Sequence, residues 1–153
     1  MEKNKSQNNN SKRELYHEEI LKHAKIPNYN DKLEHVDATG YAVNQFCGDE
    51  VKVDLSINNG IITDICVDSL GCSINVASSS LIAGTINNVK PEKAVSLINI
   101  YRKLMQDTYV STYDKNLLGS LTVMESVKKF PIRIKCALLA TQAIDDAILQ
   151  ITA

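Results

Sequence analysis

The stretch VKVDLSINNGIITDICV, residues 51–67, decides the fold that the sequence predicts. In its first half, apolar side chains alternate with polar ones, which is the pattern of a β-strand with one buried face. The Asn-Asn-Gly sequence at 58–60 predicts a tight turn, and a second strand follows over 61–67. Tyr41 and Val43 indicate an earlier strand. We therefore expect a three-stranded antiparallel sheet.

Helical periodicity lies on both sides of this predicted sheet. Before it, Ser11 begins a capping box ahead of the helical run 15–25, which Pro27 ends. After it, apolar residues recur at steps of three and four. The helices expected there cover 74–86 with a left-handed end at Asn88, 91–105, a short stretch after Ser120, and 131–148, while 107–119 is polar and predicted to be a loop. This order predicts an α+β fold in which helices cover one face of the sheet.

Composition limits the class of protein. With 153 residues, 44% hydrophobic and 23% charged, the chain fits one globular domain over 11–153, preceded by a disordered tail at 1–10. A formal net charge of -1 gives no electrostatic reason to expect binding to nucleic acid or to a membrane surface. The sequence shows neither a transmembrane run nor a signal peptide, so we expect a cytoplasmic protein with reduced thiols.

The four cysteines lie in different predicted settings. Cys47 is in a turn with Gly48 and Asp49, and Cys72 and Cys136 are near helix starts, where free N–H groups and the helix dipole favour a thiolate. Three sulfurs and the Asp49 carboxylate suit tetrahedral zinc or a labile iron site. Cys66 is predicted on the polar face of its strand. The alternative is that all four are ordinary buried cysteines, because the gaps between them do not match a zinc finger.

Three motifs, CGDEV at 47–51, GIITDICVDSLGCSINVASSSL at 60–81 and FPIRIKCALLA at 130–140, together resemble one family. It is the NifU-like N-terminal domain of iron–sulfur cluster assembly proteins, called IscU or SufU in different systems, and the resemblance runs from 15 to 149. It implies a SufE/NifU-like fold with Cys47, Asp49, Cys72 and Cys136 as metal or cluster ligands.

Two features resemble the SufU branch of the family: Lys135 before the last cysteine, and a long path between the middle helices. The resemblance then implies a zinc protein, at most a zinc-dependent sulfurtransferase, that accepts sulfur from a cysteine desulfurase through Cys47. Arg133 lies on the Cys136 side of its helix, where it would pair with Asp49 or attract a persulfide. The alternative for Arg133 and Lys135 is a solvated basic face.

Two further functions stay open at this point. The first is a scaffold that assembles a transient iron–sulfur cluster on the same ligands and passes it to recipient apo-proteins or to a downstream assembly scaffold. The second is a globular interaction module with a purely structural zinc. The sequence also departs from the family at IPNYND, where only Pro27 keeps its place, and at Asn75, where the family has serine.

Overall fold

The computed structural model describes residues 18–152. A first helix covers 18–25 and ends before Pro27, as predicted; the expected tail and the capping box at Ser11 lie outside the described residues. The other elements, in chain order, are strands β1 (Ala38–Asn44), β2 (Asp49–Asn58) and β3 (Ile61–Leu70), helices α2 (Ser73–Ile86), α3 (Pro91–Met105) and α4 (Thr112–Leu118), the 3-10 helix η1 (Gly119–Lys129), and helix α5 (Pro131–Thr152).

The predicted three-stranded antiparallel sheet is confirmed, in the order β1-β2-β3. Val53 in the central strand lies opposite Gly40 of β1 and Val67 of β3. The β2–β3 turn forms at Asn59 and Gly60, which both adopt positive φ. The alternation correctly predicts which face of β2 is buried. The apolar face packs against the helices, because the polar side chains of the other face would lose their hydration there.

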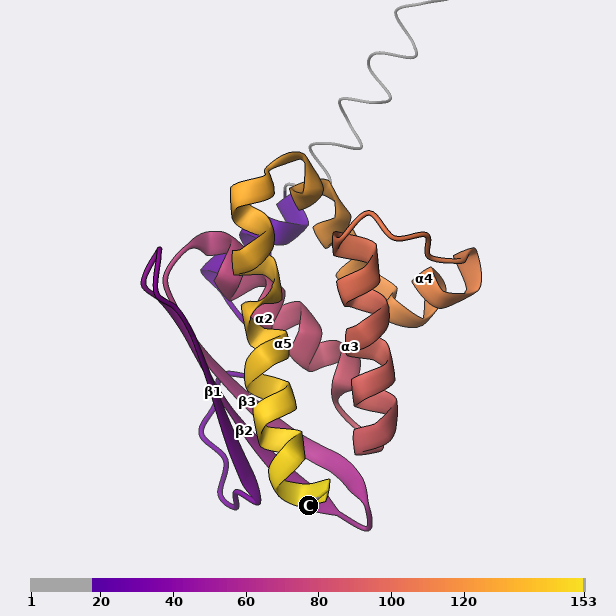
Figure 1. The fold of residues 1–153 in the computed structure, drawn as a ribbon. Coiled ribbons are helices and arrows are strands. Elements are labelled where there is room, and N and C mark those ends of the chain that lie inside the picture. The colour runs from indigo at the N-terminus through magenta and orange to yellow at the C-terminus, as the bar shows by residue number, and fades with distance from the viewer. Residues whose placement is uncertain (1–17, 153) are drawn as a thin grey trace, which may run out of the picture.

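Helices cover one face of this sheet (Figure 1), which confirms the α+β prediction. Helix α5 runs along β1 and β2, α2 packs against β3, and α3 lies farther from the sheet. The contact between α5 and β1 is very close, because a Cβ added at Gly40 would lie 1.9 Å from the carbonyl oxygen of Ala143. For this reason β1 buries small residues, while Tyr41 and Val43 face away from the helices.

The polar segment 107–119 is not only a loop, which corrects the prediction. It contains the short helix α4, whose N-cap Ser111 accepts a hydrogen bond from the Asp114 backbone N–H. Gly119 follows with a φ of 58° and ends the helix. A single seven-residue helix has too little periodic sequence to stand out from polar surroundings. Within residues 18–152, no helix has the length and apolar character needed to cross a membrane.

The outer face of the sheet is partly covered by the segment that precedes β1. The backbone N–H of Val67 donates to the Tyr29 carbonyl oxygen at 2.6 Å, so this segment lies along the free edge of β3. Cys66 is buried at this point instead of lying on an open polar face. The sequence pattern assigned its side of the strand but not the segment that covers it.

Candidate metal centre

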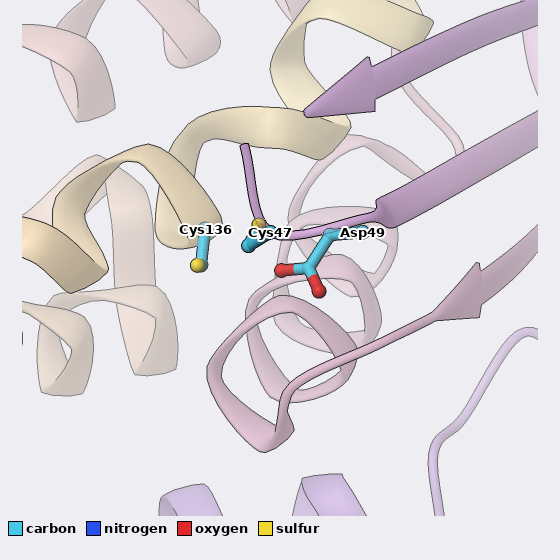
Figure 2. A group of neighbouring side chains, drawn as sticks. All are labelled: Cys47, Asp49 and Cys136. Atoms are coloured by element: carbon cyan, nitrogen blue, oxygen red, sulfur yellow. The ribbon is translucent and has the colours of Figure 1, made fainter. Parts of the chain in front are cut away.

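Cys47, Asp49 and Cys136 meet at one end of the sheet (Figure 2). Their sulfur and carboxylate oxygen atoms all lie within 4.8 Å of one another. Cys47 comes from the β1–β2 turn, Asp49 is the first residue of β2, and Cys136 belongs to α5. The packing of α5 on the sheet therefore brings together two motifs that are far apart in the sequence.

The turn that carries Cys47 is shaped by Asn44 and Gly48. The backbone N–H of Gly48 donates to the Asn44 carbonyl oxygen at 2.8 Å, and the N–H of Phe46 donates to Asn44 Oδ1 at 3.1 Å. Gly48 has a φ of 74°, a conformation that a residue with a side chain rarely adopts. Glycine is therefore suited to this position, and Cys47 beside it is exposed to solvent.

Asp49 is the buried centre of the site, with 2% of its surface exposed. Its Oδ1 accepts a hydrogen bond from the backbone N–H of Cys72 at 3.0 Å. Burial acts to raise the pKa of this carboxyl, but hydrogen bonds from the Cys72 N–H and from the thiols of Cys136, Cys72 and Cys47 prevail and lower its pKa. The ionised carboxylate is thus the form that the site favours.

Cys72 is the N-cap of α2 and is partly exposed. Its thiol is close enough to Asp49 and Cys136 to influence the pKa values of both, although it does not lie within 4.8 Å of every ligand atom in the group of three. The structure therefore brings the four predicted ligands to one place, three of them in a compact group and Cys72 at its margin.

The prediction that a helix start favours the Cys136 thiolate is corrected by the structure. It is the sixth residue of α5, beyond the residues whose N–H groups are free. Burial raises the pKa of the Cys136 thiol, and hydrogen bonds with Cys72 and Asp49 and the nearby negative charges raise it further. The protonated thiol is therefore the form that these surroundings favour, and a bound cation would favour the thiolate.

The donor set fits a metal ion. Within the described part of the chain, the buried Oδ2 of Asp49 has no hydrogen-bond partner, which costs free energy unless a cation or another group meets it. Three thiols and one carboxylate match the ligand types that zinc takes in a four-coordinate site. The same soft sulfur donors suit iron in a cluster.

Arg133 is placed less favourably than the sequence suggested. Its side chain is exposed, and it forms no ion pair within residues 18–152, so the expected pairing with the buried Asp49 is absent there. Cys66 lies outside the group of three, as the sequence analysis expected. Burial raises the pKa of the Cys66 thiol, as do the charges of Asp54 and Asp68.

Sequence reasoning missed two features around the site. Asn75 is fully buried, and its Nδ2 donates to the carbonyl oxygens of Leu70 and Glu50 at 3.1 and 3.4 Å, which joins the start of α2 to the ends of both strands beside Asp49. The signal was an asparagine in the first turn of a helix whose other polar residues are small hydroxyl side chains. The second is a contact between Phe46 and Lys135, for which no local pattern exists.

Comparison with known proteins agrees with this architecture. The family model of the NifU-like N terminal domain matches residues 15–137. The iron-sulfur cluster assembly scaffold protein IscU of Thermotoga maritima is 30% identical over 138 residues, which cover 90% of this chain and 95% of that protein. The zinc-dependent sulfurtransferase SufU of Bacillus subtilis is 32% identical over 139 residues, covering 88% and 89%.

Solved structures show the same fold. A crystal structure described as an iron-sulfur cluster assembly scaffold for the SUF system of Fervidobacterium islandicum superposes with a TM-score of 0.79, at 25% identity, covering 86% of this chain and 94% of that chain. A hypothetical protein superposes with a TM-score of 0.81, at 31% identity, covering 89% and 98%. The match of the family model over most of the chain, together with these relatives, shows that this chain belongs to the NifU-like N-terminal domain family.

Proposed function

We propose that this chain is an iron–sulfur cluster assembly protein that binds zinc and accepts sulfur from a cysteine desulfurase through Cys47. The observation that carries the proposal is an exposed Cys47 thiol beside the buried Asp49 and Cys136, in a chain similar to a zinc-dependent sulfurtransferase. The four cysteines are free thiols, which suits a reducing compartment such as the cytoplasm.

Zinc would be held by Cys47, Asp49, Cys72 and Cys136. When bound, it would supply the positive charge that keeps the thiols ionised and meets the unpartnered oxygen of Asp49. Cys47 is the ligand best placed to leave, because it is exposed on a turn, whereas Cys136 is buried in a long helix. Asp49, Cys72 and Cys136 then remain as ligands.

In the transfer step, the free Cys47 thiolate attacks the outer sulfur of the desulfurase persulfide. The bond between the two sulfurs of the partner breaks, and its cysteine leaves as a thiolate while a persulfide forms on Cys47. Sulfur moves at the same oxidation state, so no external oxidant or reductant is needed. The exposed Arg133 would attract the anionic persulfide at this stage.

The surroundings of Cys47 suit contact with a protein partner. Large apolar side chains near the predicted ligands in the sequence are exposed: Phe46 by 93%, Leu70 by 62% and Ile132 by 87%. Large apolar residues that stay exposed next to reactive residues are typical of a protein interface. We assign this rim to the docking of the desulfurase.

The ligand assignment is tested by the metal content of single alanine variants. We expect Cys47→Ala, Asp49→Ala, Cys72→Ala and Cys136→Ala to lower bound zinc, while Cys66→Ala keeps it, because Cys66 lies outside the group. Metal removal should also lower the melting temperature, since zinc binds the folded site. Equal loss of zinc from Cys66→Ala and Cys72→Ala would contradict the assignment.

Sulfur acceptance is tested by incubation with a cognate desulfurase and free cysteine, followed by alkylation and mass spectrometry of the peptides. We expect the added sulfur first on Cys47, and we expect Cys47→Ser to lose its stimulation of the desulfurase. Sulfur found first on Cys72 or Cys136, or full stimulation by Cys47→Ser, would overturn this role.

A scaffold function is the second candidate, favoured by the similarity to the Thermotoga maritima scaffold protein. In that case the same four residues would hold a transient iron–sulfur cluster as cargo and transfer it to apo-proteins. Elemental analysis and the visible absorption spectrum of freshly purified protein separate the two functions, because zinc is colourless and a cluster absorbs strongly. A purely structural zinc would need a closed site, to which the exposure of Cys47 is poorly suited.

A further inference from the structure

Two residues next to predicted ligands touch each other across the site. The ammonium nitrogen of Lys135 lies 5.3 Å from the centre of the Phe46 ring, which is within the range of a cation–π interaction. Phe46 directly precedes Cys47 on the turn, and Lys135 directly precedes Cys136 on α5. The pair therefore bridges the two elements that carry these cysteines.

We propose that Phe46 and Lys135 form a latch that holds the β1–β2 turn against α5 and thereby limits how often the Cys47 thiol moves away from Asp49 and Cys136. The latch would regulate the site of the proposed function, and its importance for sulfur transfer rests on that function. The contact itself is a property of the metal-free chain, so it is testable separately.

The attraction between charge and ring is the main force in this contact. Because the Phe46 side chain is 93% exposed, it buries very little apolar surface, and the hydrophobic effect contributes little to its position. Lys135 is exposed as well. An ammonium group over an aromatic face is still attracted by the negative charge of the ring surface.

Within residues 18–152, the hydrogen bonds that shape the turn stay within it and do not reach α5. The N–H groups of Gly48 and Phe46 both bond to Asn44, the last residue of β1. These bonds preserve the local shape of the turn but allow it to move as a unit. The Phe46–Lys135 contact joins this unit to the helix carrying Cys136, beside the close approach of the Cys47 and Cys136 sulfur atoms.

The strength of the contact suits a latch that a partner opens. An exposed cation–π pair changes an equilibrium by about two- to fivefold, so the closed turn is favoured but opens readily. The ring of Phe46 would gain much more by entering an apolar pocket of the desulfurase. Lys135 would then be free to face the anionic persulfide beside Cys47.

The test measures the alkylation rate of Cys47 by iodoacetamide in the metal-free full-length protein, with the modified peptide located by mass spectrometry. We expect Phe46→Leu and Lys135→Met to accelerate this reaction by about two- to fivefold, because each removes one half of the pair. Phe46→Trp and Lys135→Arg preserve an aromatic face and a cation, so they should react at the parent rate or more slowly. The double variant Phe46→Leu/Lys135→Met should react no faster than the faster single variant.

Two controls separate the latch from general surface effects. Tyr109→Leu removes another highly exposed aromatic side chain, and Lys93→Met removes an exposed lysine of α3; both should leave the rate unchanged.

Parent-like rates in both Phe46→Leu and Lys135→Met would overturn the latch, as would equal acceleration by Lys135→Arg and Lys135→Met. The outcome is independent of the proposed function. If the variants alkylate faster but the desulfurase places no sulfur on Cys47, the latch stands and sulfur acceptance fails. If the alkylation rate is the same in all variants and the desulfurase still places sulfur on Cys47, sulfur acceptance stands and the latch fails.

Discussion

Asp49 Oδ1 accepts a hydrogen bond from the backbone N–H of Cys72, so the first residue of β2 is joined to the N-cap of α2. Gly71 makes this contact possible, because a Cβ at that position would lie 1.9 Å from the same oxygen. Asp49 thus has one oxygen engaged with the protein and one buried oxygen without a partner in the described residues. This division leaves the second oxygen available to a metal.

We expect Asp49→Ala, reconstituted with iron and sulfide, to hold its cluster longer than the parent protein. Loss of the hard oxygen donor leaves a site of soft sulfur ligands, which exchange more slowly with iron–sulfur cargo. The decay of visible absorbance in the presence of a chelator measures the lifetime. A lifetime equal to or shorter than that of the parent would contradict the prediction that the Asp49 carboxylate keeps a bound cluster labile.

Gly71→Ala should lower both metal content and stability. The added methyl group would overlap the Asp49 carboxylate, and φ at this position is +125°, so we expect a loss of about 1–3 kcal/mol in the free energy of unfolding. Gly60→Ala is the matched control, since it also has positive φ but no atom within 4 Å of the new Cβ. It should cost about 1–2 kcal/mol and keep full metal content. Equal metal content in the two variants would show that Gly71 does not position Asp49.

Gly40→Ala should destabilise the protein by about 1–3 kcal/mol, because α5 must move away from β1 to accommodate the methyl group near the Ala143 carbonyl oxygen. Gly84→Ala is the control: its nearest neighbour is Tyr29 Cε2 at 3.4 Å, and alanine in a helix interior is favoured by up to about 1 kcal/mol. Urea denaturation compares the two. A Gly40→Ala variant as stable as the parent would contradict the close packing of α5 on β1.

The buried Cys66 should make stability fall at alkaline pH. Its pKa is raised in the folded protein by burial and by the charges of Asp54 and Asp68. The protonated thiol thus stabilises the fold fully below the unfolded pKa of about 8.5, and this contribution is lost as the pH rises above that value. We expect the free energy of unfolding, measured in urea, to fall less with pH in Cys66→Ala than in the parent. An identical pH dependence in the two proteins would exclude this role.

The sheet and its buried face were predictable from the sequence because they depend on local patterns. Alternation along 51–57 and the turn at Asn59 and Gly60 are encoded within a few residues of the elements that they form. The helix over 91–105 was predictable for the same reason, since its periodicity is continuous. The three cysteine motifs were specific enough to indicate the family, which the family model confirms.

Only the tertiary structure decided the state of the site, because that state depends on contacts between residues far apart in the sequence. The protonated Cys136 thiol, the coverage of Cys66 by the segment before β1, and the meeting of Phe46 with Lys135 all result from how α5 and that segment pack on the sheet. Burial and charge proximity are properties of the assembled core, and local periodicity contains no information about either. The sequence by itself therefore determined most of the elements and the predicted ligands, and the packing of α5 and α2 on the sheet decided the chemical environment of these ligands.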